Sequence, residues 1–90
     1  MSIELREYSH VHSHNYTVVM ANLRGNLLDH VGHGSYDAES LARNSADLIK
    51  LVDSEVSSII GSPLEVEIIG TNGTIKILVE RELLKILVMG

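Results

Sequence analysis

Three histidines spaced two residues apart have the clearest potential for chemistry in this chain: His10, His12 and His14. If their segment is extended, alternation places the three imidazoles on one side of it. Three imidazoles can hold Zn²⁺ and leave a fourth position open, which His30 or His33 could fill. The spacing therefore makes a small metal-binding protein one hypothesis for this chain. The competing interpretation is a group of solvated histidines near a chain terminus.

Ser35, His33 and Asp37 formally supply the side chains of a serine hydrolase. The serine lacks the Gly-x-Ser-x-Gly turn between a strand and a helix that activates such nucleophiles. Gly32 and Gly34 fit a turn before a helix, where free amide groups can bind an anion. Neither a Gly-Lys-Ser/Thr phosphate loop nor a dinucleotide fingerprint is present. We therefore expect no catalytic residue and no cofactor, and a protein that is not an enzyme.

The composition limits the classes of protein that this chain can form. Its 90 residues suffice for one domain, and with 44% hydrophobic residues but only three tyrosines as aromatics the core must be aliphatic. A net charge of −5 argues against a nucleic-acid-binding surface. The absence of cysteine excludes disulfides and thiol chemistry. No apolar run reaches the roughly 18 residues of a membrane helix, and no secretory signal is visible. We expect a cytoplasmic protein without membrane insertion.

The first half of the chain predicts a β-hairpin followed by a helix. Residues 16–23 are apolar and β-branched, which is typical of a strand, and residues 26–31 resemble a second strand. Arg24 and Gly25 supply the turn between them.

The helix is expected to begin near Ser35 or Asp37, either of which can cap its free amide groups. It is expected to end at Gly61, because Pro63 follows two residues later.

The second half predicts three strands, at residues 64–70, 73–79 and 83–89. Asn72 and Gly73 favour the two central positions of a type I′ turn, because both tolerate a positive φ. Such a turn fixes the register and places Ile69 opposite Lys76, Ile68 opposite Ile77, Val66 opposite Val79, and Glu65 opposite Glu80.

The helix carries more apolar surface than one sheet requires. At about 100° per residue it has two adjoining stripes, which together cover roughly 160°. The first stripe contains Leu41, Ser45, Leu48, Val52, Val56 and Ile59. The second is rich in small residues and contains Ala38, Ala42, Ala46, Ile49 and Ile60. We expect the first to face the protein's own sheet and the second to meet a second copy of the helix. One wide core face is the alternative.

These patterns predict an α/β fold with two layers, in which a five-stranded, mostly antiparallel sheet carries one long helix in the order ββαβββ. Residues 1–15 form an N-terminal segment of uncertain structure, and residues 16–90 form the domain.

This order of elements resembles the roadblock/dynein light chain family, and profilin-like domains share part of the plan. The resemblance rests on the hairpin with Arg24-Gly25 at its turn, on the helix start from Asp37 to Ala42, and on the three strands that follow. Because the sequence stops at Gly90, the resemblance implies a minimal version that lacks the family's last helix.

The resemblance implies a homodimer that pairs the long helices and the strands that follow them. Such dimers are non-enzymatic adaptors or scaffolds that bind and regulate small Ras-like GTPases, and a purely structural subunit of a complex is the plainer alternative. The interface residues expected on this basis are Ala38, Ala42, Ala46, Ile49, Glu65, Glu67 and Ile69.

Overall fold

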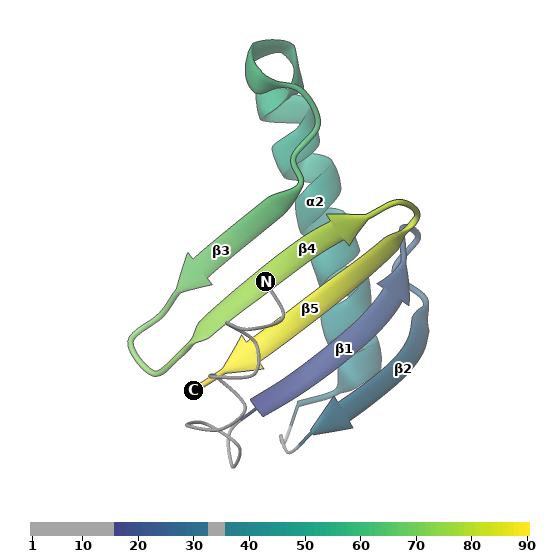
Figure 1. Cartoon of the computed structure of the whole chain (residues 1–90), viewed down its shortest axis with the longest axis vertical. Coiled ribbons are helices and arrows are strands. Elements are labelled where there is room, and N and C mark those ends of the chain that lie inside the picture. The colour runs from purple at the N-terminus through teal and green to yellow at the C-terminus, as the bar shows by residue number, and fades with distance from the viewer. Residues whose placement is uncertain (1–15, 33–35) are drawn as a thin grey trace.

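The architecture is a five-stranded sheet with one helix on one face (Figure 1), seen in a computed structural model that describes residues 16–32 and 36–90. The elements are β1 (Tyr16–Asn22), β2 (Leu27–Gly32), α2 (Ala38–Ile60), β3 (Glu65–Ile69), β4 (Thr74–Glu80) and β5 (Leu83–Met89). The strand order across the sheet is β2-β1-β5-β4-β3, and every neighbouring pair is antiparallel. The predicted fold class and element order are confirmed.

Helix α2 starts and stops where the capping residues predict. The Asp37 carboxylate accepts hydrogen bonds from the backbone N–H groups of Glu39 and Ser40, which satisfies two amides of the first turn. Gly61 ends the helix with φ 87°, a conformation that glycine adopts without strain, and its N–H donates to the carbonyl of Ser57.

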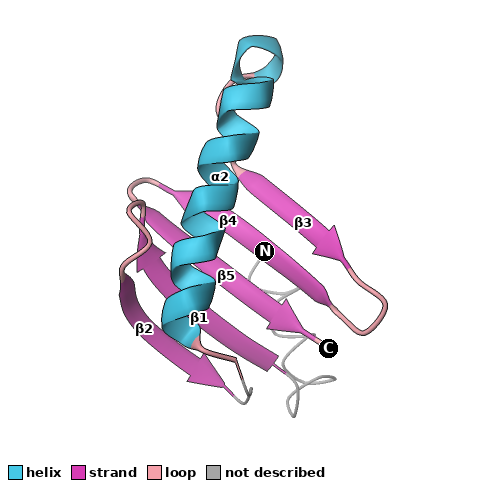
Figure 2. Ribbon diagram, turned by 180° about the vertical axis from the view of Figure 1, so that it is seen from behind, coloured by secondary structure: helices cyan, strands magenta, loops and turns pink. Residues whose placement is uncertain are grey.

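The core lies between α2 and the central strands, and it is aliphatic as the composition requires. Seen from behind the sheet (Figure 2), α2 runs diagonally across one face; it packs on β1, β2 and β5. The buried cluster consists of Val19, Ala21, Ala42, Ala46, Ile77, Leu84, Ile86 and Val88.

The β1–β2 hairpin closes through a polar side chain that the sequence pattern did not single out. The Asn22 side-chain oxygen accepts hydrogen bonds from the N–H groups of Arg24 and Asn26, each at 3.0 Å. Gly25 has φ 90° and lies directly against the helix, so that an added Cβ would be 2.8 Å from the Cα of Arg43. This glycine is therefore required both by its backbone conformation and by the close approach of the turn to α2.

The predicted register between β3 and β4 is wrong by two residues. The structure pairs Ile69 with Thr74, Ile68 with Ile75, Val66 with Ile77 and Glu65 with Leu78. A shift of two keeps each side chain on its predicted face, since strand side chains alternate with a period of two. Glu65 and Glu80 are therefore not opposed as predicted, because Glu65 pairs with Leu78 and Glu80 with Leu83.

The register differs because Asn72 and Gly73 are not the central turn pair. The Gly70 N–H donates to the Gly73 carbonyl at 2.7 Å, which leaves Thr71 and Asn72 between them. Neither Asn72 nor Gly73 has a positive φ, so the turn is not type I′. A Cβ on Gly73 would lie 2.6 Å from the Met89 carbonyl oxygen, so this glycine serves the close approach of β5.

Candidate interaction surface

The alanine stripe of α2 is used within the protein itself. Ala42 and Ala46 are 0% and 1% exposed, and the Ala46 Cβ lies near the Gly25 turn. Ala38 and Ile49 are half-buried at the margin of the same core. The prediction that Ala42 and Ala46 face a second copy is therefore corrected, because small residues are what allow the β1–β2 turn to approach the helix.

The other stripe of α2 borders a part of the sheet that the helix does not cover. Arg43 and Ala46 mark the side of α2 next to the β1–β2 turn. At 100° per residue, Leu48 and Val52 lie roughly opposite that side, towards β4 and β3. Figure 2 shows most of β3 and β4 free of the helix. We call this the open face, and its apolar residues are Leu48, Val52, Val66, Ile68 and Ile75.

The open face is hollowed at one end. A cavity of about 400 Å³ lies between Tyr36 and the β3–β4 loop, with Ile68, Ile75 and Val88 in its lining. Ile68 is 43% exposed although its cross-strand neighbour Ile75 packs against the core. Aliphatic side chains around an open hollow indicate a surface that is suited to apolar contact with another molecule.

Among the described residues, strand β3 forms one edge of the sheet beside the open face. The predicted interface residues Glu65, Glu67 and Ile69 all lie on it, exposed, on the face away from the helix. Ile69 is 76% exposed, and Leu64, just before the strand, is 73% exposed. An edge strand with exposed apolar residues is suited to pair with a strand of another chain. Monomeric proteins usually protect their edge strands against such pairing.

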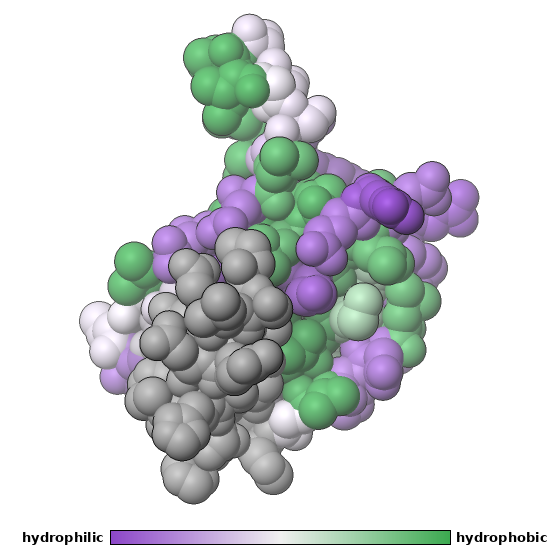
Figure 3. Space-filling model, in the orientation of Figure 1, coloured by the Kyte–Doolittle hydropathy of each residue, from purple (hydrophilic) through white to green (hydrophobic). Residues whose placement is uncertain are grey.

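The end of α2 adds further exposed apolar side chains. Ile59 and Ile60 are both at least three-quarters exposed in the last turn of the helix. In the space-filling view (Figure 3) hydrophobic atoms gather at the end of the molecule where α2 extends past the sheet. The large apolar side chains that α2 leaves exposed are therefore Leu51, Ile59 and Ile60, while Leu48 packs against the core and Val52 is half-buried beside the open face.

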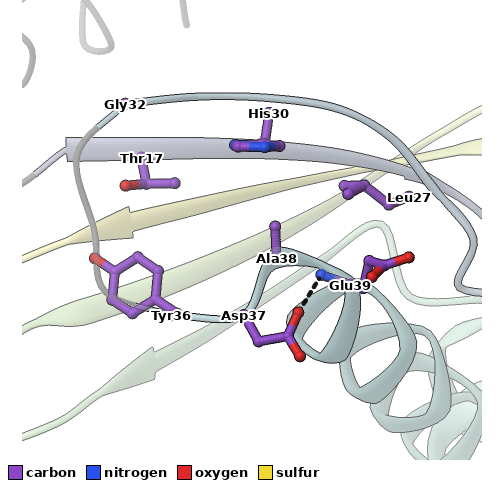
Figure 4. Close-up of a pocket in the computed structure, with 8 residues that line it drawn as sticks. All are labelled: Thr17, Leu27, His30, Gly32, Tyr36, Asp37, Ala38 and Glu39. Atoms are coloured by element: carbon purple, nitrogen blue, oxygen red, sulfur yellow. Dashed lines mark hydrogen bonds between the residues drawn. The ribbon is translucent and has the colours of Figure 1, made fainter.

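A second cavity, of about 350 Å³, lies between β2 and the start of α2 (Figure 4). Its polar lining includes Thr17, His30, Asp37 and Glu39. The amides that could have bound an anion here already donate to the Asp37 carboxylate. With the two carboxylates of Asp37 and Glu39 in its lining, this cavity does not suit an anion.

The Asp37 carboxyl is held in its ionised form by its capping bonds. The Ser40 hydroxyl, which donates to it at 2.9 Å, lowers its pKa below the ordinary 3.8. The backbone amides of Ser40 and Glu39 and the charge of Arg43 act in the same direction. A lowered pKa in the folded state means that this group stabilises the fold above about pH 4, and that the contribution is lost as the pH falls through the folded-state pKa.

We expect Asp37→Ala to lower the melting temperature at neutral pH, because two amides of the first turn lose their acceptor. Asp37→Asn should retain most of the cap at neutral pH but lose the acid dependence that Asp37 supplies. Thermal unfolding of the three proteins between about pH 3 and about pH 7 checks this. Equal melting curves for Asp37→Ala and the unsubstituted protein at pH 7 would contradict it.

The candidate metal and hydrolase residues are not brought together by the described part of the structure. His10, His12, His14, His33 and Ser35 lie outside the described residues. Within residues 16–32 and 36–90, no three histidine, aspartate or glutamate side chains are grouped to hold a metal ion. Over the same residues, no helix has the length and apolar character to cross a membrane.

No protein-family model and no curated protein matches this sequence. Among solved structures it resembles MglB of Myxococcus xanthus, at 14% identity and a TM-score of 0.76 over 92% of this chain and 69% of that one. It also resembles a roadblock/LC7 domain from Streptomyces avermitilis, at 13% identity and a TM-score of 0.74 over 94% and 73% of the two chains. It also resembles the gliding protein MglB of Thermus thermophilus, at 14% identity and a TM-score of 0.74 over 98% of this chain and 70% of that one. At such identities the likeness shows the fold: this chain has the roadblock/LC7 fold, as its element order predicts.

Proposed function

We propose that two copies of this protein form a non-enzymatic cytoplasmic adaptor that binds and regulates a small Ras-like GTPase. The observation that carries the proposal is the open face: one helix covers only part of a five-stranded sheet and leaves aliphatic side chains on β3 and β4 accessible. Apolar surface of this kind is typical of protein interfaces rather than of a solvated face.

The dimensions of the two layers support a second helix on the open face. The axes of the two outer strands of five lie roughly 19 Å apart, because neighbouring strands lie about 4.8 Å apart. A helix with its side chains is about 10 Å wide, so two helices are needed to cover such a sheet. A second copy brings its own five strands together with its own α2, so a dimer covers the open face only if the two helices lie side by side above the paired β3 strands.

The free edge of β3 supports the same arrangement. If β3 of one protomer pairs with β3 of the other, the two sheets become one and the two open faces adjoin. Leu48 and Val52 then lie where the partner's helix can pack on them. Of the predicted interface residues, Ile49, Glu65, Glu67 and Ile69 remain in this proposal, and Leu64, Ile68, Ile59 and Ile60 join them.

The GTPase partner rests on the resemblance to the roadblock family and on the shared fold with MglB and the roadblock/LC7 domain. A dimer of this kind offers a large rigid platform, which suits the recognition of a GTPase whose switch loops change with the bound nucleotide.

The experiment is capture of small GTPases on the immobilised protein from a native lysate, supplied in parallel with GDP and with a non-hydrolysable GTP analogue. We expect one small GTPase to be retained in one nucleotide state only. A matched column of a variant that is expected to dimerise much more weakly, Ile68→Glu, should retain less of it. Capture of no GTPase, or of the same amount with either nucleotide, would contradict the proposal.

A further inference from the structure

The centre of the free edge strand is an acidic residue. Strand β3 is the five-residue segment Glu65–Ile69, and Glu67 is its midpoint. Glu65 and Glu67 are exposed on the face away from α2. Opposite Glu67 on β4 is Lys76, and β3 itself contains no basic residue.

The hydrogen bonds of the hairpin show which residues of β3 point their backbone to the free edge. The Val79 N–H donates to the Leu64 carbonyl at 2.9 Å, and the Gly70 N–H donates to the Gly73 carbonyl at 2.7 Å. In an antiparallel ladder such bonded residues alternate, so the even-numbered residues of β3 bond to β4. The odd-numbered residues, Glu65, Glu67 and Ile69, therefore direct their N–H and C=O groups outward.

Symmetry restricts how this edge can pair with its own copy. Two identical strands that pair about a two-fold axis perpendicular to the sheet must run antiparallel, and each residue must lie opposite one of the same face. The register with full overlap places Glu65 opposite the partner's Ile69, and Val66 opposite the partner's Ile68. It allows about six backbone hydrogen bonds, since each outward-facing pair exchanges two. Registers displaced by two residues lose part of this pairing.

The full-overlap register brings the two copies of one carboxylate together on the axis. We propose that Glu67 lies opposite the partner's Glu67, and that repulsion between them limits the strength of the dimer and makes it dependent on charge and salt. This inference rests on the proposed pairing of β3 strands. Lys76 attracts each carboxylate away from the axis and keeps the repulsion moderate.

A pair of isosteric variants tests the proposal, because Glu65 and Glu67 share a strand and a face but not a position in the register. We expect Glu67→Gln to lower the dimer dissociation constant roughly two- to five-fold, which corresponds to the cost of one directly opposed like-charge pair. Glu65→Gln, with the same change in net charge, should have a smaller effect because Glu65 lies opposite an isoleucine.

Sedimentation equilibrium at about 20 mM and about 500 mM NaCl provides the measurement, since the higher concentration screens charges beyond a few ångströms. The unsubstituted protein should dimerise more tightly at high salt, and Glu67→Gln should respond less. Equal effects of the two glutamine variants, or a weaker dimer for Glu67→Gln, would overturn the proposal.

Cysteine cross-linking locates the axis directly, because the chain contains no cysteine of its own. Opposed residues of a hydrogen-bonded pair have Cα atoms about 5.5 Å apart, which a disulfide can bridge. Oxidised Glu67→Cys should run as a covalent dimer, and Ile68→Cys should not. A cross-link from Ile68→Cys alone would overturn the register and leave the dimer intact. Monomers for every variant and for the unsubstituted protein would instead overturn the proposed function.

Discussion

Replacing Gly25 by alanine is expected to destabilise the protein by at least about 2 kcal/mol, enough to lower its melting temperature by about 10 °C. Two effects add. The φ of 90° at this position is strained for any residue with a side chain. The new Cβ would also lie 2.8 Å from the Cα of Arg43, a backbone atom that cannot move unless the helix moves. Thermal unfolding at a fixed protein concentration measures the change.

Gly61→Ala is the matched control for Gly25→Ala. Gly61 has nearly the same φ, 87°, but an added Cβ there meets nothing within 4 Å. Its ψ of −177° completes a conformation that essentially only glycine adopts, so its substitution should show the backbone strain alone, about 1–3 kcal/mol. If the two variants lose equal stability, the close packing of the β1–β2 turn on α2 does not contribute, and the account of Gly25 is wrong.

Ile68→Glu is expected to weaken self-association at least about 100-fold while the protomer remains folded. Ile68 is 43% exposed in the protomer, so a glutamate there can reach water when the protein is monomeric. In the proposed dimer the same side chain lies beneath the partner's helix, where an unpaired carboxylate costs several kcal/mol. Sedimentation equilibrium gives the association constant, and circular dichroism reports whether the fold is kept.

Leu28→Glu provides the control for this variant. Leu28 lies on β2, the opposite edge of the sheet, and is 54% exposed, so the chemical change is the same and the starting exposure is similar. Its dimer should be as strong as that of the unsubstituted protein. Equal weakening of the dimer by Leu28→Glu would contradict an interface at the β3 edge.

The elements and faces of this fold follow from its sequence because the signals are local. Capping residues set the limits of the helix: Asp37 caps one end of α2 and Gly61 caps the other. Strand β5 coincides with the predicted 83–89, because an apolar run between two turn segments has few alternatives.

The register of β3 on β4 could not be predicted, because Gly73 has two possible roles. The pair Asn72-Gly73 is typical of a type I′ turn, and a local pattern favours that interpretation. The structure instead uses Gly73 where the chain passes the carbonyl of Met89, a residue 16 positions away. Contacts between distant segments of this kind leave no trace in the local sequence.

The prediction that Ala42 and Ala46 meet a second copy is wrong for a related reason, whereas Leu41 and Leu48 of the other stripe do pack against the core, as predicted. Alanines are small enough to meet either a second helix or a tight turn, and the sequence does not distinguish the two. The deciding contact is Gly25 against Arg43 and Ala46, which exists only once the hairpin has folded onto α2. With the alanines buried, the apolar surface left for a partner is that of Leu48, Val52 and β3.

Sedimentation equilibrium of the unsubstituted protein, over a range of micromolar concentrations, tests the central claim that a second copy covers the open face. The chain has a mass of 9.9 kDa. We predict a particle of twice that mass that dissociates on dilution and is lost in Ile68→Glu. A single species of 9.9 kDa at every concentration, stable and folded with its open face in water, would contradict the account.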